Sequence, residues 1–116
     1  MHTIKKLVLL ITLSIILTAC GSNKRSFDMK VHSDPLGAYA LMQIKYSGDE
    51  DSDWLFLGPT PVVIDKTVRF ENAKTVTLKV IRPGFYEQVK SWKAKDFVKE
   101  HKKYNGISWV PIMVKQ

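Results

Sequence analysis

The apolar and polar residues of the chain form an apolar run, a short polar stretch and then a long region of alternation. Residues 7–19 carry no charged side chain, and residues 21–26 are small and polar or basic. From Phe27 onward, apolar side chains recur at every second position, as in strands with one buried face. We therefore expect a folded region that begins at Phe27 and consists mainly of strands.

Three segments show the alternation most clearly. Their apolar positions, each expected on the buried face of a strand, are Phe27, Met29 and Val31; Ala38, Ala40, Met42, Ile44 and Tyr46; and Val76, Leu78 and Val80. Shorter apolar segments at 54–57, 62–64 and 86–92 are also expected to be extended, with turn-forming residues between them. Several short strands at turn-marked intervals favour a small antiparallel β-sandwich.

Residues 93–104 change to the period of a helix. The residues at helical spacing are Ala94, Phe97, Val98, His101 and Tyr104. The Asn105-Gly106 pair follows where a helix C-cap needs a positive φ. Residues 107–114 return to a strand pattern, and Pro111 confines that strand to an edge or a bulge. The predicted fold is mainly β, a small antiparallel β-sandwich with one C-terminal α-helix and a final edge strand.

The first 19 residues have the organisation of an export signal. Lys5 and Lys6 precede the uncharged run from Leu7 to Ala19. A run of this length matches the apolar region of a signal peptide, whereas a membrane-crossing helix needs roughly 20 apolar residues. The alternative interpretation is a short, uncleaved membrane anchor.

Leu17-Thr18-Ala19-Cys20 resembles the lipobox of bacterial lipoproteins, and Cys20 is the single cysteine of the chain. The resemblance implies cleavage between Ala19 and Cys20, a diacylglyceryl group on the thiol and an acyl group on the new α-amine. Two or more acyl chains anchor a protein stably. The expected organisation is a signal peptide at 1–19, a lipidated flexible tether at 20–26 and one domain at 27–116. The expected location is the bacterial cell envelope, and Gly21 after the cysteine favours the outer membrane in a diderm host.

Composition narrows the function classes. The region after the signal is long enough for one small core and too short for two. With Cys20 used for lipid, no disulfide can form, so stability must come from the core. The formal net charge of the chain is +7, but export and lipid anchoring argue against nucleic acid as the partner.

Three stretches in chain order resemble the PEGA domain. They are VHSDPLGAY at 31–39, LGPTPVVI at 57–64 and LKVIRPGFYEQ at 78–88. The first places a proline and a glycine in a Ser-x-Pro-x-Gly-Ala pattern, the second matches a Gly-x-Thr-Pro turn, and the third ends in Gly-aromatic. The matching turn residues are Pro35, Gly37, Gly58, Thr60, Pro61 and Gly84. The resemblance implies a cell-envelope β-sandwich in which these residues are architectural.

The chain departs from the PEGA pattern at several points. Leu36 stands where the glutamate of the family's name would be, and Phe85 replaces the commoner tyrosine. The hairpin at 45–57 is longer and more acidic than usual, and residues 93–114 lie outside the pattern. The resemblance therefore bears on fold and setting more than on activity.

The sequence presents no catalytic or metal-binding motif, so we expect no enzyme activity, no metal and no cofactor besides the covalent lipid. His32 and His101 are isolated and are interpreted as solvated or structural. Asp49, Asp51 and Asp53 resemble the start of a calcium loop, but tryptophan and threonine occupy the positions of its glycine and glutamate. A solvated acidic hairpin is the favoured interpretation, with a weak calcium site of another kind as the alternative.

Two surface features leave alternatives open. Aromatic residues that could form either core or a sugar-binding platform are Tyr46, Trp54, Phe56, Trp92 and Trp109. The lysines of the predicted helix form either a solvated face or a surface attracted to anionic lipids and polymers. We expect a noncatalytic structural or protein-interaction subunit of an envelope assembly, with a membrane and an envelope protein as partners. The alternative is a carbohydrate- or peptidoglycan-binding module.

Overall fold

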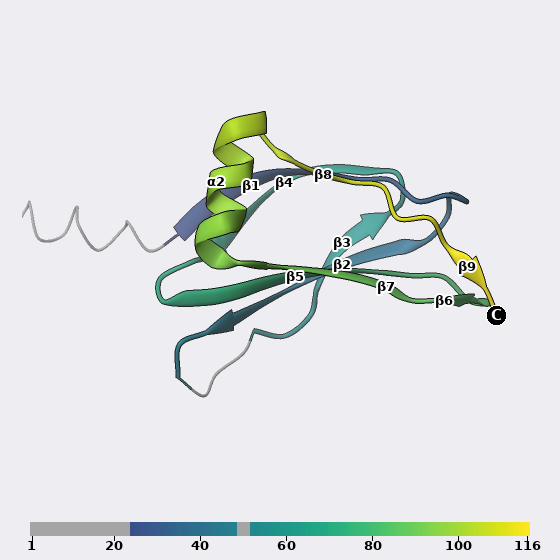
Figure 1. Cartoon of the computed structure of the whole chain (residues 1–116), viewed down its shortest axis with the longest axis horizontal. Helices are drawn as coiled ribbons and strands as arrows, with labels where there is room; N and C mark the ends of the chain where they lie inside the picture. The colour runs from purple at the N-terminus through teal and green to yellow at the C-terminus, as the bar shows by residue number, and fades with distance from the viewer. Residues whose placement is uncertain (1–23, 49–51) are drawn as a thin grey trace, which may run out of the picture.

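A computed structural model of the chain describes residues 24–48 and 52–116. Two layers of strands face each other, with a helix at one end and a short two-stranded ribbon at the other (Figure 1). In chain order the elements are β1 Lys24–Val31, β2 Tyr39–Tyr46, β3 Leu55–Pro59, β4 Val62–Arg69, β5 Ala73–Ile81, β6 Phe85–Tyr86, β7 Gln88–Lys93, α2 Ala94–Tyr104, β8 Ile107–Trp109 and β9 Val114–Lys115. The predicted β-sandwich with a late helix is confirmed.

The strand orders are β4-β1-β8 in one layer, β3-β2-β5-β7 in the other and β6-β9 in the ribbon. All of these pairs are antiparallel except β1–β8, in which Met29, Lys30 and Val31 run parallel to residues 107–109. Within the described chain, β8 therefore lies at a sheet edge, as predicted for the final strand, but in the parallel orientation.

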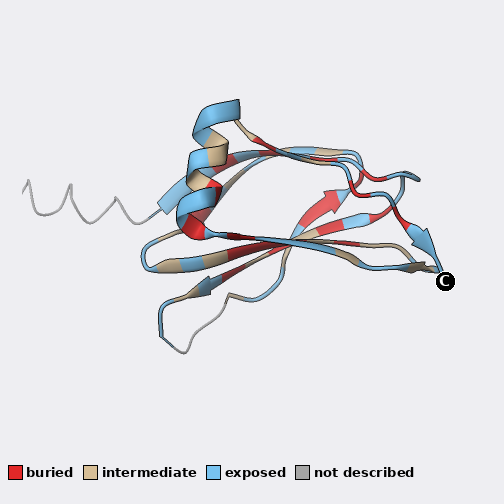
Figure 2. Ribbon diagram, viewed as in Figure 1, coloured by how far each residue is buried: buried red, intermediate tan, exposed pale blue. Residues whose placement is uncertain are grey.

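The buried core consists of the alternating positions that the sequence indicates. Its members are Phe27, Met29, Val31, Ala38, Ala40, Met42, Ile44, Leu57, Val68, Val76, Leu78, Val80, Trp92, Phe97, Ile107 and Met113. These residues line the inner surfaces of both layers and the first turn of α2 (Figure 2). The inward positions of the two sheets thus remove a continuous apolar surface from water, which is the main source of stability in a domain without disulfides.

Helix α2 closes one end of the sandwich. Ala94 and Phe97 are buried, and the last turn carries basic residues that complement the helix dipole. Asn105 adopts a left-handed conformation with φ 54°, and its backbone N–H donates to the carbonyl of His101. The predicted C-cap is confirmed.

The structure corrects several predicted boundaries. Lys24, Arg25 and Ser26, assigned to the flexible tether, belong to β1, where they pair with Arg69, Val68 and Thr67 of β4. The strand predicted at 62–64 extends to residue 69 as β4, because its later residues pair with β1. Polar side chains on the exposed face of a strand do not prevent this pairing.

The predicted strands at 86–92 and 107–114 are each interrupted. The first divides into β6 and β7 at Glu87, and the second breaks between β8 and β9. Pro111 lies in the second break, where its carbonyl accepts from the Asp34 N–H at 3.1 Å. A proline lacks the N–H that a continuous ladder needs.

Candidate functional site

Three of the predicted turn residues, Pro35, Gly37 and Thr60, meet in a buried hydrogen-bond network between the end of β1 and the β3–β4 turn. The Thr60 Oγ1 lies 2.5 Å from the Ser33 Oγ and accepts from the Ala38 N–H at 3.0 Å. The Ser33 hydroxyl also donates to the Pro35 carbonyl at 2.7 Å. The Thr60 N–H donates to the Ala38 carbonyl at 2.7 Å, and the Gly37 N–H donates to the Thr60 carbonyl at 3.3 Å. Two stretches more than 20 residues apart are thereby joined.

The other predicted turn residues are also architectural. Gly37 and Gly84 have φ of 88° and 86°, which glycine adopts without strain. Gly58 has φ 142°, and a Cβ there would lie 3.1 Å from a methyl group of Val62. Pro61 follows Thr60 directly and precedes the start of β4. Gly84 lies at the far end of β5, so it is not part of the Thr60 network.

Several predictions fall outside the described residues. Ala19 and Cys20 of the lipobox, and Asp49 and Asp51 of the acidic hairpin, are among them. Within 24–48 and 52–116, no group of three or more His, Cys, Asp or Glu side chains could hold a metal ion. No helix in these ranges has the length and apolarity needed to cross a membrane.

The structure shows which of the five aromatic residues, interpreted either as core or as a sugar-binding platform, are buried and which are exposed. Trp92 is 9% exposed and belongs to the core, where its ring lies 5.3 Å from that of Phe97. Tyr46 and Trp109 are half-buried against the core. Trp54 and Phe56 are exposed, and Phe56 has 57% of its surface accessible. The core interpretation is therefore confirmed for Trp92 and wrong for Trp54 and Phe56.

Trp54 and Phe56 belong to an apolar surface on the outside of the four-stranded sheet. Cross-strand pairing places Phe56 beside Leu41, Leu41 beside Lys79, and Lys79 beside Val89. Tyr39 lies beside Ile81 in the next row. We name this surface the aromatic face, and it consists of Tyr39, Leu41, Trp54, Phe56, Ile81 and Val89.

The rings of the aromatic face are not coplanar. The Tyr39 and Phe56 centroids are 6.1 Å apart and the rings are inclined by 43°. The Lys79 Nζ lies 3.9 Å from the centroid of the Trp54 ring, so a cation already occupies one side of that indole. Such an arrangement presents an uneven apolar surface rather than a flat stacking platform.

The charged side chains at the outward positions of β2, β5 and β7 are all cationic. The outward positions of β2, β5 and β7 alternate with the buried ones, and their charged residues are Lys45, Lys79 and Lys93. No aspartate or glutamate occupies an outward position of these three strands. The face is thus apolar toward Tyr39 and Phe56 and carries lysines on its strands, with the exposed acids Asp53 and Glu87 at its border.

The sequence itself carries a signal for this face. In the strand at 38–46, Tyr39 and Leu41 fall on the side opposite the core positions. Large apolar residues on both sides of a strand in a two-layer sandwich indicate that the outer side is a binding surface. The residues missed in this way are Tyr39, Leu41, Ile81 and Val89.

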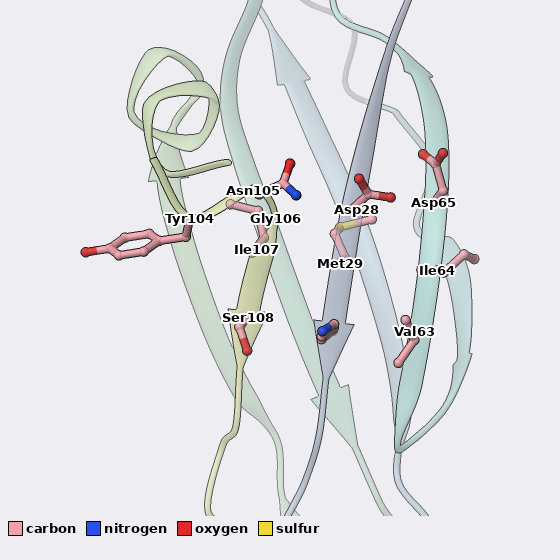
Figure 3. A pocket seen from close by; sticks show the side chains of 11 residues that line it. Asp28, Met29, Val63, Ile64, Asp65, Tyr104, Asn105, Gly106, Ile107 and Ser108 are labelled. Carbon is pink, nitrogen blue, oxygen red and sulfur yellow. The ribbon is translucent and has the colours of Figure 1, made fainter. Parts of the chain in front are cut away.

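A hollow of about 540 Å³ lies on the outer side of the other sheet, beside the end of α2. Figure 3 shows its lining side chains, with Asp28 and Asp65 on neighbouring strands and Tyr104 pointing away from them. Asp28 and Asp65 are paired directly across β1 and β4, and both are exposed. Like charges placed opposite each other on one sheet face repel.

We therefore expect the substitution Asp65→Thr to raise the free energy of unfolding by about 0.5–1 kcal/mol, because it removes the repulsion and adds a β-branched residue. Urea unfolding of the full chain in detergent micelles, followed by circular dichroism, measures this change. Asp53→Thr is the control at an exposed acid outside the described strands. A destabilised Asp65→Thr variant would show that the two carboxylates are held together by something that offsets their repulsion.

The two histidines match the interpretation as structural or solvated, since His101 has a structural role and the His32 side chain is exposed. The His101 Nε2 accepts from the Asp28 N–H at 3.0 Å, and the ring lies edge-on to Phe27 at 5.3 Å. His32 is exposed, and its backbone N–H donates to the Trp109 carbonyl. His101 therefore joins α2 to β1.

Lysine side chains cover the outer surface of α2. Lys95, Lys99, Lys102 and Lys103 are all exposed, and they share the helix with Asp96 and Glu100. Figure 1 shows that this helix lies beside the start of β1. The lysines are therefore placed at the end of the domain where the chain enters from residues 1–23.

Comparison with protein-family models, with curated proteins and with solved structures finds no match. The resemblance to PEGA domains and to the lipobox therefore stays a prediction from the residues.

Proposed function

We propose that this chain is a lipid-anchored protein of the bacterial cell envelope that binds another protein noncatalytically through its aromatic face. The observation that carries the proposal is the exposure of Trp54, Phe56 and Tyr39 together on the outside of one sheet. Protein interfaces are enriched in tyrosine, tryptophan and phenylalanine, and contiguous exposed apolar surface on a small domain marks a binding site.

The partner's chemistry follows from the charge around the face. Lys45, Lys79 and Lys93 lie on the outward side of the sheet without an acid between them. Electrostatic complementarity favours an apolar patch bordered by acidic residues on the partner. The inclined rings and the lysine already packed on Trp54 favour a protein surface over a sugar ring.

The short connection to the proposed lipid would orient the domain with its α2 end toward the membrane. Because β1 begins at Lys24, covalent geometry allows at most roughly 14 Å between Cys20 and the sandwich. A lipid on Cys20 would bring the α2 end of the domain to the headgroups, where the lysines of α2 gain about 1 kcal/mol each near an anionic surface. The ribbon of β6 and β9, at the opposite end, would be directed away from the membrane.

Site-specific photo-crosslinking in intact cells of the host tests the interface. With a benzophenone amino acid at Phe56, we expect a discrete adduct of defined mass, because the ring is exposed within the aromatic face. The control position is Val63, which is 75% exposed on the opposite sheet and should give no such adduct. A double substitution Trp54→Ala and Phe56→Ala should lower partner recovery at least tenfold.

Two results would contradict the proposal. The first is the absence of an adduct from Phe56, and the second is equal adducts from Phe56 and Val63. The anchor has its own test, since mass spectrometry of the chain recovered from membranes should show a first residue at Cys20 and the added mass of the acyl chains. A recovered chain that begins at Met1 and carries no lipid mass would favour an uncleaved apolar anchor.

A glycan-binding module is the second candidate, and exposed Trp54 is the observation that favours it. Sedimentation with purified cell-wall sacculi at low and high salt distinguishes it. Binding that survives high salt, with a shift in Trp54 fluorescence, would put glycan recognition first. Binding lost at high salt would reflect only attraction between lysines and a charged polymer.

A further inference from the structure

A second hollow, of about 510 Å³, opens beside the aromatic face at the end of the sandwich opposite α2. Tyr39 and Ile81 belong both to this hollow and to the aromatic face. The remaining apolar lining comes from Pro83, Phe85 and Tyr86, so five of its eight lining residues are apolar or aromatic. Arg82 is the cation among them.

The backbone around Arg82 is held on both sides. The Phe85 N–H donates to the Arg82 carbonyl at 3.1 Å, which closes a tight turn through Gly84. The Gln116 N–H donates to the Gly84 carbonyl at 2.9 Å, and β6 pairs with β9. The guanidinium carbon lies 4.9 Å from the centroid of the Phe85 ring. The turn and the Phe85 ring therefore hold the arginine beside the hollow.

One nitrogen of this guanidinium lacks a partner. The Arg82 Nη1 is buried, and within residues 24–48 and 52–116 it has no hydrogen-bond acceptor. Most buried polar atoms are hydrogen-bonded, and a charged group left without an acceptor lowers stability. Arg69 offers a contrast, because it packs on Tyr46 at 4.3 Å but is exposed to water.

We propose that the Arg82 hollow binds a peptide carboxylate that is flanked by an apolar side chain. A guanidinium presents parallel N–H donors that match the two oxygens of a carboxylate. Because Nη1 is buried, the Arg82 side chain would rotate toward the hollow when the carboxylate binds. The aromatic and aliphatic lining would receive the neighbouring side chain. Glu87 also lines the hollow, and its negative charge disfavours a doubly charged phosphate relative to a single carboxylate.

This inference rests on the proposed function for its choice of a protein partner, since Tyr39 and Ile81 connect the hollow to the aromatic face. A partner segment could lie on the aromatic face and place one carboxylate at Arg82. The binding of a small carboxylate at Arg82 does not depend on that partner, so the two claims can fail separately.

The test is a titration of the full chain in detergent micelles, followed by the backbone N–H NMR signals of Phe85 and Tyr86, which line the hollow and are present in every variant. The probes are N-acetylphenylalanine, its amide, glucuronic acid and phenyl phosphate. We expect a saturable shift with N-acetylphenylalanine and at least tenfold weaker binding of the amide, which lacks the carboxylate. Glucuronic acid and phenyl phosphate should also bind at least tenfold more weakly.

The variants separate binding from folding. Arg82→Lys keeps the charge but loses the paired donors, so affinity should fall at least tenfold. Arg69→Lys is the matched control and should leave affinity unchanged. Arg82→Met should abolish binding while raising the urea midpoint, because it removes a buried nitrogen that has no acceptor.

Equal binding of the amide, or unchanged affinity in Arg82→Lys, would overturn the proposal. Equal or tighter binding of glucuronic acid or phenyl phosphate would overturn the assignment to a peptide. A lower urea midpoint in Arg82→Met, together with no shift for any probe, would show that Arg82 is structural. If N-acetylphenylalanine binds while crosslinking from Phe56 fails, the carboxylate site at Arg82 is supported and the proposed protein interface is contradicted.

Discussion

Replacing Phe97 with alanine is expected to lower the free energy of unfolding by about 3–5 kcal/mol. Phe97 is 0% exposed and joins α2 to both layers, with its ring 4.9 Å from that of Phe27 and 5.3 Å from that of Trp92. Its removal leaves a cavity where the helix meets the sheets and deletes two edge-to-face aromatic contacts. Small domains have a total stability of about 5–15 kcal/mol, so this variant would be close to unfolding.

Urea unfolding of the full chain in detergent micelles, followed by circular dichroism, measures the effect. Tyr104→Ala is the control on the same helix, because Tyr104 is 67% exposed, and its effect should stay within about 0.5 kcal/mol. A loss below about 1 kcal/mol for Phe97→Ala would mean that the helix is an appendage rather than part of the core. The helix lies outside the PEGA-like stretches, so this result also decides where the folded unit ends.

The substitution Thr60→Val is expected to lower the free energy of unfolding by about 2–3 kcal/mol. Valine has nearly the same shape, so the change deletes the hydroxyl and leaves the packing in place. The buried Ala38 N–H then loses its acceptor, and the Ser33 oxygen loses its contact with Thr60 but keeps its bond to the Pro35 carbonyl. Burying a polar group without a hydrogen bond costs more than the bond itself contributes.

Thr67→Val is the matched control for this change. The Thr67 Oγ1 also bonds a serine hydroxyl, that of Ser26 at 2.6 Å, but both residues are exposed. Water replaces the lost partner there, so the free energy of unfolding should change by less than about 0.5 kcal/mol. Equal effects of Thr60→Val and Thr67→Val would show that burial does not set the strength of the network.

A double-mutant cycle with Ser33→Ala tests whether the two turns act as one unit. If the hydroxyls of Ser33 and Thr60 form one network, the combined loss should be smaller than the sum of the single losses by about 1 kcal/mol. Strict additivity would contradict a shared network. This network gives the PEGA-like residues a physical role, since they connect the end of β1 to the β3–β4 turn.

The sequence alone determined the alternating core, the helix and its cap. Phe27, Met29, Met42 and Val76 are buried as their period-two spacing predicts, because a strand packed on one side must alternate. Asn105 caps α2 because few residues besides glycine and asparagine tolerate a positive φ. These features depend on local geometry and on spacing along the chain.

Tertiary structure alone decided the features that depend on pairing across the chain. Lys24 to Ser26 form a strand only because β4 lies beside them, and Trp54 and Phe56 are exposed only because their sheet has one partner layer. Spacing along a strand distinguishes its two sides but does not indicate whether a second layer covers the outer one. The unpartnered nitrogen of Arg82 also depends on the turn at Gly84 and on the packing around it, which residue types in sequence do not specify.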